Sequence, residues 1–544
     1  MKASELLVRC LENEGVARIF GLPGEENLDV MDALLDSPIH FVLCRHEQGA
    51  AFMADVHGRL TGEAGVCLST LGPGATNLVT GVADANLDHA PLVAITGQAG
   101  LARMHKESHQ YLDLVRLFEP ITKYNAQVKR AQTLPEVVRK AFKVARTEKP
   151  GACHIDLPED EAAAVVEDAA PLLRQQPFTP VPSDRQIDRA VAVLREARAP
   201  LILAGNGVIR GRAAAALARF AERLNIPVAH TFMAKGAIPY TSPLSLGSVG
   251  LQAHDYISRG FDRADCVIAV GYDLVEYAPE QWNPQRDKRI LHVDASPAEV
   301  DAHYIVEVGV VGEIATALER MAERAPASQD RGYASLNNVI REQLAAHADD
   351  PGFPVKPQRI LSEIRRALGP EDIVVSDVGA HKLWIARMYP ALAPNTCLIS
   401  NGFAAMGIAL PGAIAAAFLH PERRILAATG DAGFLMNVQE LETAVREKRS
   451  LVVLIFNDGG YGLIDWKQRQ HFGRPSHVAF GNPNFVALAE SFGALGLRVE
   501  AADELRPALE TAFAAGRPAV IDCPVDYREN LRLTEELGHI TCAL

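Results

Sequence analysis

The chain lacks the surplus of positive charge that nucleic-acid-binding proteins use. Its 544 residues include 54 Lys and Arg against 67 Asp and Glu, which gives a formal net charge of −13 at pH 7. Without an excess of cations to neutralise phosphate groups, general binding to nucleic acid or to an anionic membrane surface is not expected. The acidic balance mainly indicates solubility.

Paired cysteines and long apolar segments are missing as well. The eight cysteines, at 10, 44, 67, 153, 266, 397, 523 and 542, show no Cys-x-x-Cys pair and no zinc-site spacing with histidine, which predicts scattered reduced thiols. The longest apolar run, 407–419, is too short to span a bilayer and contains Pro411, and it predicts a buried helix. Because Glu5, Glu12 and Glu14 interrupt the apolar N-terminus, it resembles an amphipathic helix rather than a signal peptide. We therefore expect a cytoplasmic protein.

What the sequence does contain is a repeated alternation of short apolar runs and helix-like segments. Apolar runs at 39–44, 65–70, 91–97, 200–204, 266–270, 290–293, 424–429 and 451–456 are expected strands. This rhythm predicts an α/β fold of three doubly wound domains with mainly parallel sheets. Two linkers rich in Ala, Pro and acidic residues, near 160–184 and 322–354, divide the chain into expected domains at 1–165, 185–321 and 357–544.

Two acidic residues follow neighbouring expected strands in the last domain. Asp431 lies in Gly430-Asp431-Ala432-Gly433, and Asp458 lies in Asn457-Asp458-Gly459-Gly460, with a helix expected over 437–445 between them. Carboxylates at the carboxyl ends of adjacent parallel strands, with glycines that permit close backbone approach, are what Mg²⁺ bridging to a diphosphate requires. Two ordinary strand-to-helix turns are the alternative, and the presence of the pair favours the metal-diphosphate site.

A third carboxylate stands out in the first domain. Glu47 lies where the strand ending at Cys44 passes into a helix of small residues, so its side chain is expected to be partly desolvated. A glutamate that merely stabilises the start of a helix remains the alternative. In the central domain, residues 204–211 fit a loose G-x-G-x-x-x-G, a weak dinucleotide signal for which a structural turn is preferred.

These motifs together resemble the thiamin-diphosphate-dependent acetolactate synthase family, and the resemblance covers essentially the whole chain. It implies that the carboxylates of Asp431 and Asp458 and the carbonyl of Gly460 hold Mg²⁺. It also implies that Glu47 bonds the pyrimidine ring of a cofactor held by a partner subunit, so that the protein is a homodimer or a homotetramer. Further cofactor-binding residues implied by the resemblance are Val378, Gly379, Ala380, His381, Asn401, Gly402, Met406, Ala432 and Gly433.

Several stretches resemble the catabolic, flavin-free branch of that family. They are residues 106–113, 117–124, 271–277 and 524–530, and they imply that FAD is not a cofactor. Gln110, in the first of them, is a candidate for contacting substrate, with a plain surface glutamine as the alternative. Lys467 departs from both branches at a position that the resemblance links to substrate choice, so the acceptor substrate stays open.

The expected activity is the decarboxylation of pyruvate and the joining of the remaining two-carbon unit to a second pyruvate, giving 2-acetolactate and CO₂. An adjacent His-His pair, which a simple decarboxylase of this kind would be expected to carry, does not occur in the sequence. The alternatives are another thiamin-diphosphate lyase or carboligase with a different donor or acceptor, and a non-catalytic homologue that binds the cofactor.

Overall fold

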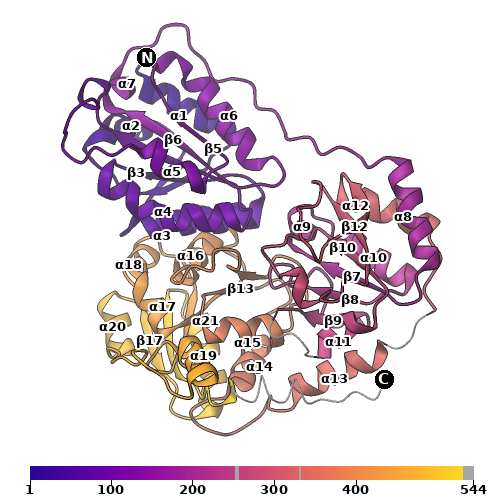
Figure 1. The fold of residues 1–544 in the computed structure, drawn as a ribbon. Coiled ribbons are helices and arrows are strands. Elements are labelled where there is room, and N and C mark those ends of the chain that lie inside the picture. Colours follow the sequence, from indigo (N-terminus) through magenta and orange to yellow (C-terminus); the bar gives the residue numbers. More distant parts are fainter. Residues whose placement is uncertain (251–255, 330–332, 531–544) are drawn as a thin grey trace. The chain divides into compact units, whose positions relative to one another are not determined.

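The computed structural model describes residues 1–250, 256–329 and 333–530 (Figure 1). These residues contain three six-stranded sheets in which every pairing between strands is parallel. The prediction of an α/β protein with three parallel-sheet domains is therefore confirmed. Seven of the cysteines are buried free thiols, as expected, and Cys542 lies outside the described residues.

The first sheet has the strand order β2-β1-β3-β4-β6-β5. The expected strands at 39–44, 65–70 and 91–97 are found as β2, β3 and β4, within one residue at each end. Strands β5 and β6 were missed, because His154 and Asp156 interrupt the apolar run of β6 although both are buried. The strands are Arg18–Gly21, His40–Leu43, Gly65–Ser69, Leu92–Gln98, Tyr124–Gln127 and Ala152–Pro158 (β1 to β6), and the helices are Ala3–Glu14, Leu28–Leu34, Glu47–Thr61, Gly72–Leu87, Leu114–Phe118, Leu134–Arg146 and Glu159–Ala163 (α1 to α7).

The central sheet has the order β12-β11-β10-β7-β8-β9. Its expected strands at 200–204, 266–270 and 290–293 are β7, β10 and β11. Strands β8 and β9, of three and four residues, are too short to leave a periodic signal. The strands are Pro200–Ala204, Val228–His230, Ser245–Ser248, Cys266–Val270, Arg289–Asp294 and Val306–Val311 (β7 to β12), and the helices are Asp184–Glu196, Asn206–Arg210, Ala214–Leu224, Tyr256–Arg263, Ile314–Arg324 and Ala334–Ala345 (α8 to α13).

The third sheet has the order β14-β13-β15-β16-β18-β17. The strands are Ile373–Ser376, Cys397–Ile399, Ile425–Gly430, Val452–Asn457, Leu495–Arg498 and Ala519–Pro524 (β13 to β18). The helices that follow in this part of the chain are Pro357–Ala367, Ala380–Met388, Ala409–Leu419, Asp431–Met436, Glu440–Arg446, Gly462–Phe472, Phe485–Ser491 and Leu505–Ala514 (α14 to α21). The buried helix expected within 407–419 is confirmed as α16, whose residues 409–418 are all buried.

The helix expected over 437–445 is present as α18, which begins at Glu440 rather than at Asn437. A separate short helix, α17, precedes it and begins at Asp431 itself. The chain breaks between them at Asn437, whose side-chain Nδ2 donates to the carbonyl of Gly407 at 2.9 Å. This side-chain bond replaces helix continuation, as short amide side chains often do.

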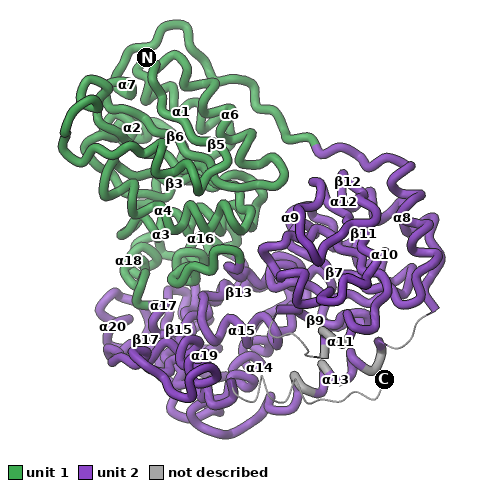
Figure 2. The backbone as a smooth tube through the Cα atoms, viewed as in Figure 1, with its two compact units in different colours: residues 1–178, 402–421, 435–449 green, residues 179–401, 422–434, 450–544 purple. Residues whose placement is uncertain are grey.

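The chain packs into two compact units (Figure 2). One comprises residues 1–178, 402–421 and 435–449, and within it helix α16 packs against α3. The other comprises residues 179–401, 422–434 and 450–544, and its buried apolar residues form a core that runs from Leu201 on the central sheet to Cys523 on the third. The domain limits 1–165, 185–321 and 357–544 stay a prediction.

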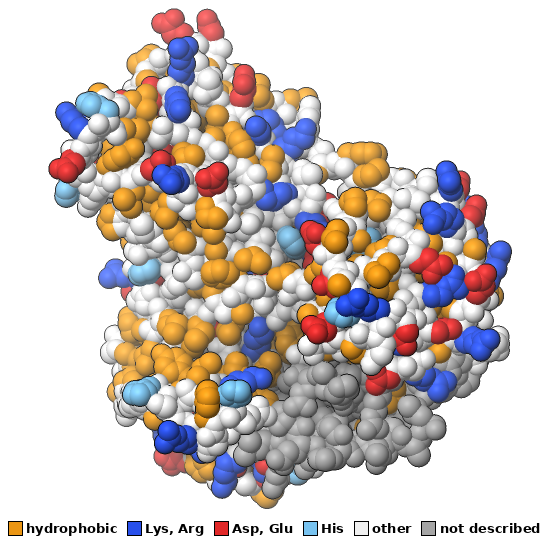
Figure 3. All heavy atoms as spheres, viewed as in Figure 1, with side chains coloured by type: hydrophobic (Ala, Val, Ile, Leu, Met, Phe, Trp, Pro, Cys, Tyr) orange, Lys and Arg blue, Asp and Glu red, His pale blue; other side chains and the backbone are white. Residues whose placement is uncertain are grey.

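Acidic and basic side chains are interspersed on the face of the central domain that Figure 3 shows. Ion pairs in this domain include Arg289 with Glu307 at 2.7 Å and Arg324 with Asp188 at 2.8 Å, all partly exposed. Among the helices of the described residues, none combines the length and the apolar character that crossing a bilayer requires.

Candidate active site

The turns after β13 and β15 meet at a topological switch point of the third sheet. These strands are direct neighbours, with Ser376 opposite Ala428, although the chain visits β14 on one side of β13 and β16 on the far side of β15. In open α/β sheets, ligands bind in the crevice that such a reversal creates at the carboxyl ends of the strands. The structure thus brings the predicted cofactor residues of two turns to one edge: Val378, Gly379, Ala380, His381, Asp431, Ala432 and Gly433.

Asp431 is almost completely buried and organises the loop around it. Its Oδ2 accepts from the N–H of Gly459 at 2.8 Å and from Nδ2 of Asn482 at 2.7 Å, and its Oδ1 accepts from the N–H of Ala432 at 2.8 Å. Burial raises the pKa of Asp431, and these hydrogen bonds oppose the rise. The carboxylate therefore holds the turn after β15 and the turn after β16 in one fixed arrangement.

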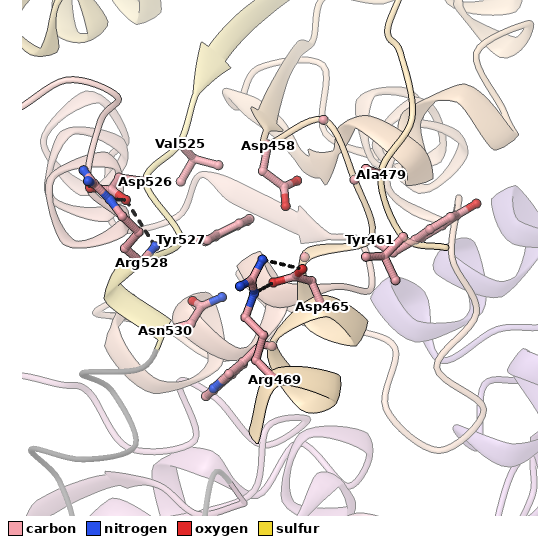
Figure 4. A pocket seen from close by; sticks show the side chains of 15 residues that line it. Asp458, Tyr461, Asp465, Arg469, Ala479, Val525, Asp526, Tyr527, Arg528 and Asn530 are labelled. Carbon is pink, nitrogen blue, oxygen red and sulfur yellow. Dashed lines mark hydrogen bonds and ion pairs between the residues drawn. The ribbon is translucent and has the colours of Figure 1, made fainter. Parts of the chain in front are cut away.

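Asp458 comes from that second turn and points into a cavity of about 500 Å³ (Figure 4). The cavity lets water reach the carboxylate, but protein encloses its other sides. This enclosure, followed by repulsion from Asp431, raises the pKa of Asp458 to about 8. A close pair of carboxylates with such a shift is a place where a bound cation would stabilise the charged forms of both.

The ligand set fits Mg²⁺ bound together with a diphosphate. Within the described residues no cluster of three or more His, Cys, Asp or Glu side chains could hold a metal ion alone. Mg²⁺ in phosphate-binding sites needs only one or two carboxylates, and phosphate oxygens and water complete its six ligands. Gly460 belongs to the same turn, which the bond from the N–H of Tyr461 to the carbonyl of Val478 fixes at 2.9 Å.

Two buried polar groups beside the pair also have unused hydrogen-bonding capacity. Among the described residues, His381 Nε2 and the Tyr527 hydroxyl have no hydrogen-bond partner. Burial lowers the pKa of His381 to about 3, so its ring is neutral, and it raises the pKa of Tyr527, with the Asp458 and Asp431 carboxylates adding to the rise. Buried polar atoms without partners are uncommon in native proteins, and here they fit a polar ligand such as a diphosphate.

Small residues keep this edge open to a ligand. A Cβ atom on Gly433 would lie 3.1 Å from the Asp377 carboxyl group, and a Cβ on Gly430 would lie 3.4 Å from the His381 ring. Gly459 adopts a φ of +70°, in the left-handed region that favours glycine. The glycines singled out in the sequence thus allow close packing at Gly433 and a sharp turn at Gly459.

Glu47 lies in the other compact unit, as the first residue of α3. It is 8% exposed, and its Oε2 accepts from Nδ2 of Asn77 at 2.9 Å. The start of a helix stabilises a carboxylate, and Asn77 sets its direction. The expected half-buried carboxylate is thus present. That it approaches a cofactor bound beside Asp431 and Asp458 stays a prediction.

Gln110 belongs to the same unit as Glu47. It is exposed and adopts a φ of +58°, which is uncommon for a residue other than glycine. A Cβ on Gly72 would lie 2.5 Å from the Gln110 carbonyl oxygen, so glycine at position 72 is what lets this loop lie against the start of α4. The loop geometry is defined, and the contact of Gln110 with substrate stays a prediction.

The remaining predicted cofactor residues lie around 401–406. Asn401 Nδ2 donates to the carbonyl of Glu276 at 3.1 Å within the second unit. Gly402, in the first unit, donates its N–H to Oδ1 of Asp88 at 2.5 Å, and Met406 there is half-buried. Their roles toward a cofactor stay predictions.

Sequence reasoning missed Asn482 and Tyr527. Asn482 Nδ2 also lies 3.0 Å from Oδ1 of Asn457, so this side chain joins both turns of the site. The only local signal is the Gly481-Asn482-Pro483 run, which marks a turn without naming its partner. Tyr527 lies in residues 524–530, a stretch whose sequence indicates only a resemblance to the catabolic, flavin-free branch.

Three family models match the chain: "Thiamine pyrophosphate enzyme, N-terminal TPP binding domain" at residues 1–117, "Thiamine pyrophosphate enzyme, central domain" at 187–321, and "Thiamine pyrophosphate enzyme, C-terminal TPP binding domain" at 377–523. The third range includes the whole edge formed by Asp431, Asp458 and His381.

Curated relatives extend the likeness to nearly the full length. The acetolactate synthase of Bacillus subtilis (strain 168) is 35% identical over 98% of this chain and 95% of its own length. The probable acetolactate synthase large subunit of Methanocaldococcus jannaschii is 36% identical over 99% and 95%. The catabolic acetolactate synthase of Raoultella terrigena is 34% identical over 98% and 97%. The chain therefore belongs to the acetolactate synthase family of thiamine pyrophosphate enzymes.

Proposed function

We propose that this protein is a thiamin-diphosphate-dependent carboligase that decarboxylates pyruvate and joins the remaining two-carbon unit to a second pyruvate, giving 2-acetolactate and CO₂. The observation that carries the proposal is the pair Asp431 and Asp458 at adjacent strand ends, in a chain related to acetolactate synthases over nearly its whole length. When bound, thiamin diphosphate would supply a nucleophilic carbon for the keto group of pyruvate and a place for the electron pair that is released with CO₂.

The residues of the third sheet have the task of holding the cofactor. The carboxylates of Asp431 and Asp458 and the carbonyl of Gly460 would bind Mg²⁺, which would neutralise the charge of the diphosphate. Helix α15 has nine residues, and the N-terminal end of a helix attracts anions. The backbone N–H groups of Ala380 and His381 lie in its first turn, at that end. Val378, Gly379, Asn401, Gly402, Met406, Ala432 and Gly433 complete the expected cofactor contacts.

Glu47 has the task of handling a proton. Its carboxylate, oriented by Asn77, would hold or release a proton at the pyrimidine ring of a bound cofactor, and this would support loss of the proton from the cofactor's reacting carbon. We propose that this cofactor is held by a partner subunit, which makes the protein a homodimer or a homotetramer. Gln110 contacts the substrate in this scheme, and the location is cytoplasmic.

Another acceptor substrate is the second candidate, and Lys467 is the observation that favours it. The side chain is exposed, with its Nζ 5.8 Å from the centre of the Trp466 ring. Trp466 itself is buried, so Lys467 presents only its cation to solvent, and a cation suits the carboxylate of a 2-oxo acid acceptor. Competition between pyruvate and 2-oxobutyrate as acceptors distinguishes the two candidates.

The direct test uses purified protein with thiamin diphosphate, Mg²⁺ and pyruvate. We expect one CO₂ and one 2-acetolactate for every two pyruvate molecules consumed, measured by CO₂ release and by product identification. Release of acetaldehyde alone would contradict carboligation. Cofactor binding without pyruvate consumption would instead identify a non-catalytic homologue.

We also propose that the protein does not use FAD, because the glycine turn of the central domain is filled by its own carboxylate. Glu276 is 7% exposed, and the N–H of Asn206 donates to its Oε1 at 3.0 Å and its Oε2 at 3.1 Å. A Cβ on Gly205 would lie 2.4 Å from the Gly271 carbonyl oxygen, so the turn packs directly on the end of β10. A dinucleotide phosphate would have to displace Glu276 from the Asn206 amide.

The purified protein is accordingly expected to be colourless and to leave FAD fluorescence unchanged on titration. The rate of pyruvate consumption should be the same with and without added FAD. A yellow protein, or a saturable change in FAD fluorescence, would overturn this part of the proposal.

A further inference from the structure

Glu440 is a buried carboxylate to which the proposed function assigns no task. It is the first residue of α18 and is 0% exposed. Its Oε1 accepts from the N–H of His46 at 2.9 Å and from the N–H of Arg45 at 3.1 Å, and its Oε2 accepts from the Thr443 hydroxyl at 2.7 Å. The two backbone donors directly precede Glu47 in the sequence.

The turn between β2 and α3 needs such an acceptor. Strand β2 ends at Leu43 and α3 begins at Glu47, so the N–H groups of Arg45 and His46 belong to neither element. Arg45 is exposed and His46 is half-buried, and the N–H groups of both donate to a side chain 395 and 394 positions away in the chain. His46 Nδ1 accepts in turn from the N–H of Gln48 at 3.0 Å.

The same segment also contacts the other side of Glu47. Asn437 Nδ2 donates to Oε1 of Gln48 at 3.2 Å. A Cβ on Gly49 would lie 2.7 Å from Oε1 of Glu440, so glycine is required there for the carboxylate to reach the turn. Residues 45, 46, 48 and 49 therefore all contact the 437–440 segment. The Glu47 side chain, between them in the sequence, instead points toward Asn77.

Stability alone is a poor explanation for this arrangement. Burial raises the pKa of Glu440 to about 7, against the hydrogen bonds from Thr443, Arg45 and His46. Buried charges are often replaceable by apolar residues without loss of stability, whereas they fix the geometry of what they bind. A network in which every polar member is bonded holds its partners in one arrangement.

We propose that Glu440 is a positioning residue that fixes the direction of Glu47 by holding the backbone in front of it. The inference rests on the proposed function, since the direction of Glu47 matters only if Glu47 acts on the cofactor. Glu440 touches neither cofactor nor substrate in this role. It acts through the two N–H groups at the start of α3.

Hydrogen exchange measures the backbone contact without any activity. In Glu440→Ala, the amides of Arg45 and His46 should exchange at least about tenfold faster than in the wild type, because their buried acceptor is gone. Glu63→Gln is the matched control, since Glu63 follows the other end of α3, is partly exposed and pairs with Arg146 at 2.7 Å. The control should leave both amides unchanged.

Kinetics then test the link to Glu47. Glu440→Ala should lower kcat about 10- to 100-fold with the KM for pyruvate within about twofold, because a small displacement of a catalytic group affects the chemical step. In a Glu47→Gln background, where there is no carboxylate left to direct, Glu440→Ala should cause no further loss. Glu440→Gln, which keeps one acceptor oxygen, should show a smaller decrease and serves as the test variant if the alanine variant does not fold.

The inference is overturned if the Glu440 variants keep the wild-type kcat, if they reduce activity by the same factor with and without the Glu47 carboxylate, or if the two amides keep their protection. Failure of the proposed function has a different signature. In that case the wild type itself does not convert pyruvate, while the exchange of the Arg45 and His46 amides still reports on Glu440.

Discussion

Asp431→Asn is expected to lower pyruvate consumption at least about 100-fold and to weaken the binding of Mg²⁺ and thiamin diphosphate together. The asparagine has the same shape but carries no charge to bind the metal. It also offers one acceptor oxygen where Asp431 uses two, so the N–H groups of Gly459 and Ala432 and the amide of Asn482 cannot all be satisfied. Binding is measured by titrating the cofactor at fixed Mg²⁺ and following protein fluorescence.

Asp372→Asn is the matched control for that variant. Asp372 lies at the opposite end of the same sheet, before β13, and also accepts from backbone donors, the N–H of Gly369 at 2.6 Å and the N–H of Arg424 at 2.9 Å. It should change stability without changing the Mg²⁺ dependence. Cofactor affinity that survives in Asp431→Asn and falls in Asp372→Asn would place the metal elsewhere. Chelation of Mg²⁺ should reproduce the effect of Asp431→Asn in the wild type and add little in the variant.

Glu47→Gln is expected to keep the fold and lower the rate about 10²- to 10⁴-fold, the usual contribution of a positioned acid or base. Glutamine can still meet Asn77, as Glu47 does at 2.9 Å, so the start of α3 remains intact. What it cannot do is exchange a proton with the cofactor. The sharpest measurement is the exchange of the cofactor's thiazolium C2 proton with deuterium in the bound state, which does not require pyruvate.

Glu63→Gln provides the comparison at the other end of the same helix. Glu63 follows the end of α3 and pairs with Arg146 at 2.7 Å, with its side chain 47% exposed. Its loss should leave C2 exchange and turnover at the wild-type level. Unchanged C2 exchange in Glu47→Gln would show that the catalytic carboxylate has been assigned to the wrong residue.

The carboxylates at the carboxyl edge of the third sheet could be predicted from the sequence because their signal is local. A short apolar run predicts a buried strand, glycines predict a tight turn, and a carboxylate after two neighbouring strands lies at the same edge of a parallel sheet. Asp431 and Asp458 satisfy all three conditions, and the structure confirms both strands that precede them. The helix between them begins three residues later than predicted, at Glu440, because the side-chain bond of Asn437 breaks the chain before it.

Hydrogen-bonded pairs of buried polar side chains could not be predicted from the sequence in this way. Strand β6 contains two polar residues, His154 and Asp156, yet both side chains are buried. His154 Nδ1 lies 2.7 Å from Oδ1 of Asn125, and Gln127 Nε2 donates to Asp156 at 2.7 Å, both from β5. Burying a polar group is tolerated only when a partner is present, and no local pattern reveals that partner.

The sequence by itself determined three parallel α/β sheets and the pair of carboxylates at a strand edge, because hydrophobic periodicity and turn chemistry act over a few neighbouring residues. Only the tertiary structure decided that Asn482 holds Asp431, that Glu276 fills the central glycine turn, and that Glu440 binds the backbone in front of Glu47. These are contacts between residues 51, 70 and 394 positions apart. Their formation depends on which donors the folded chain leaves buried without a nearer acceptor.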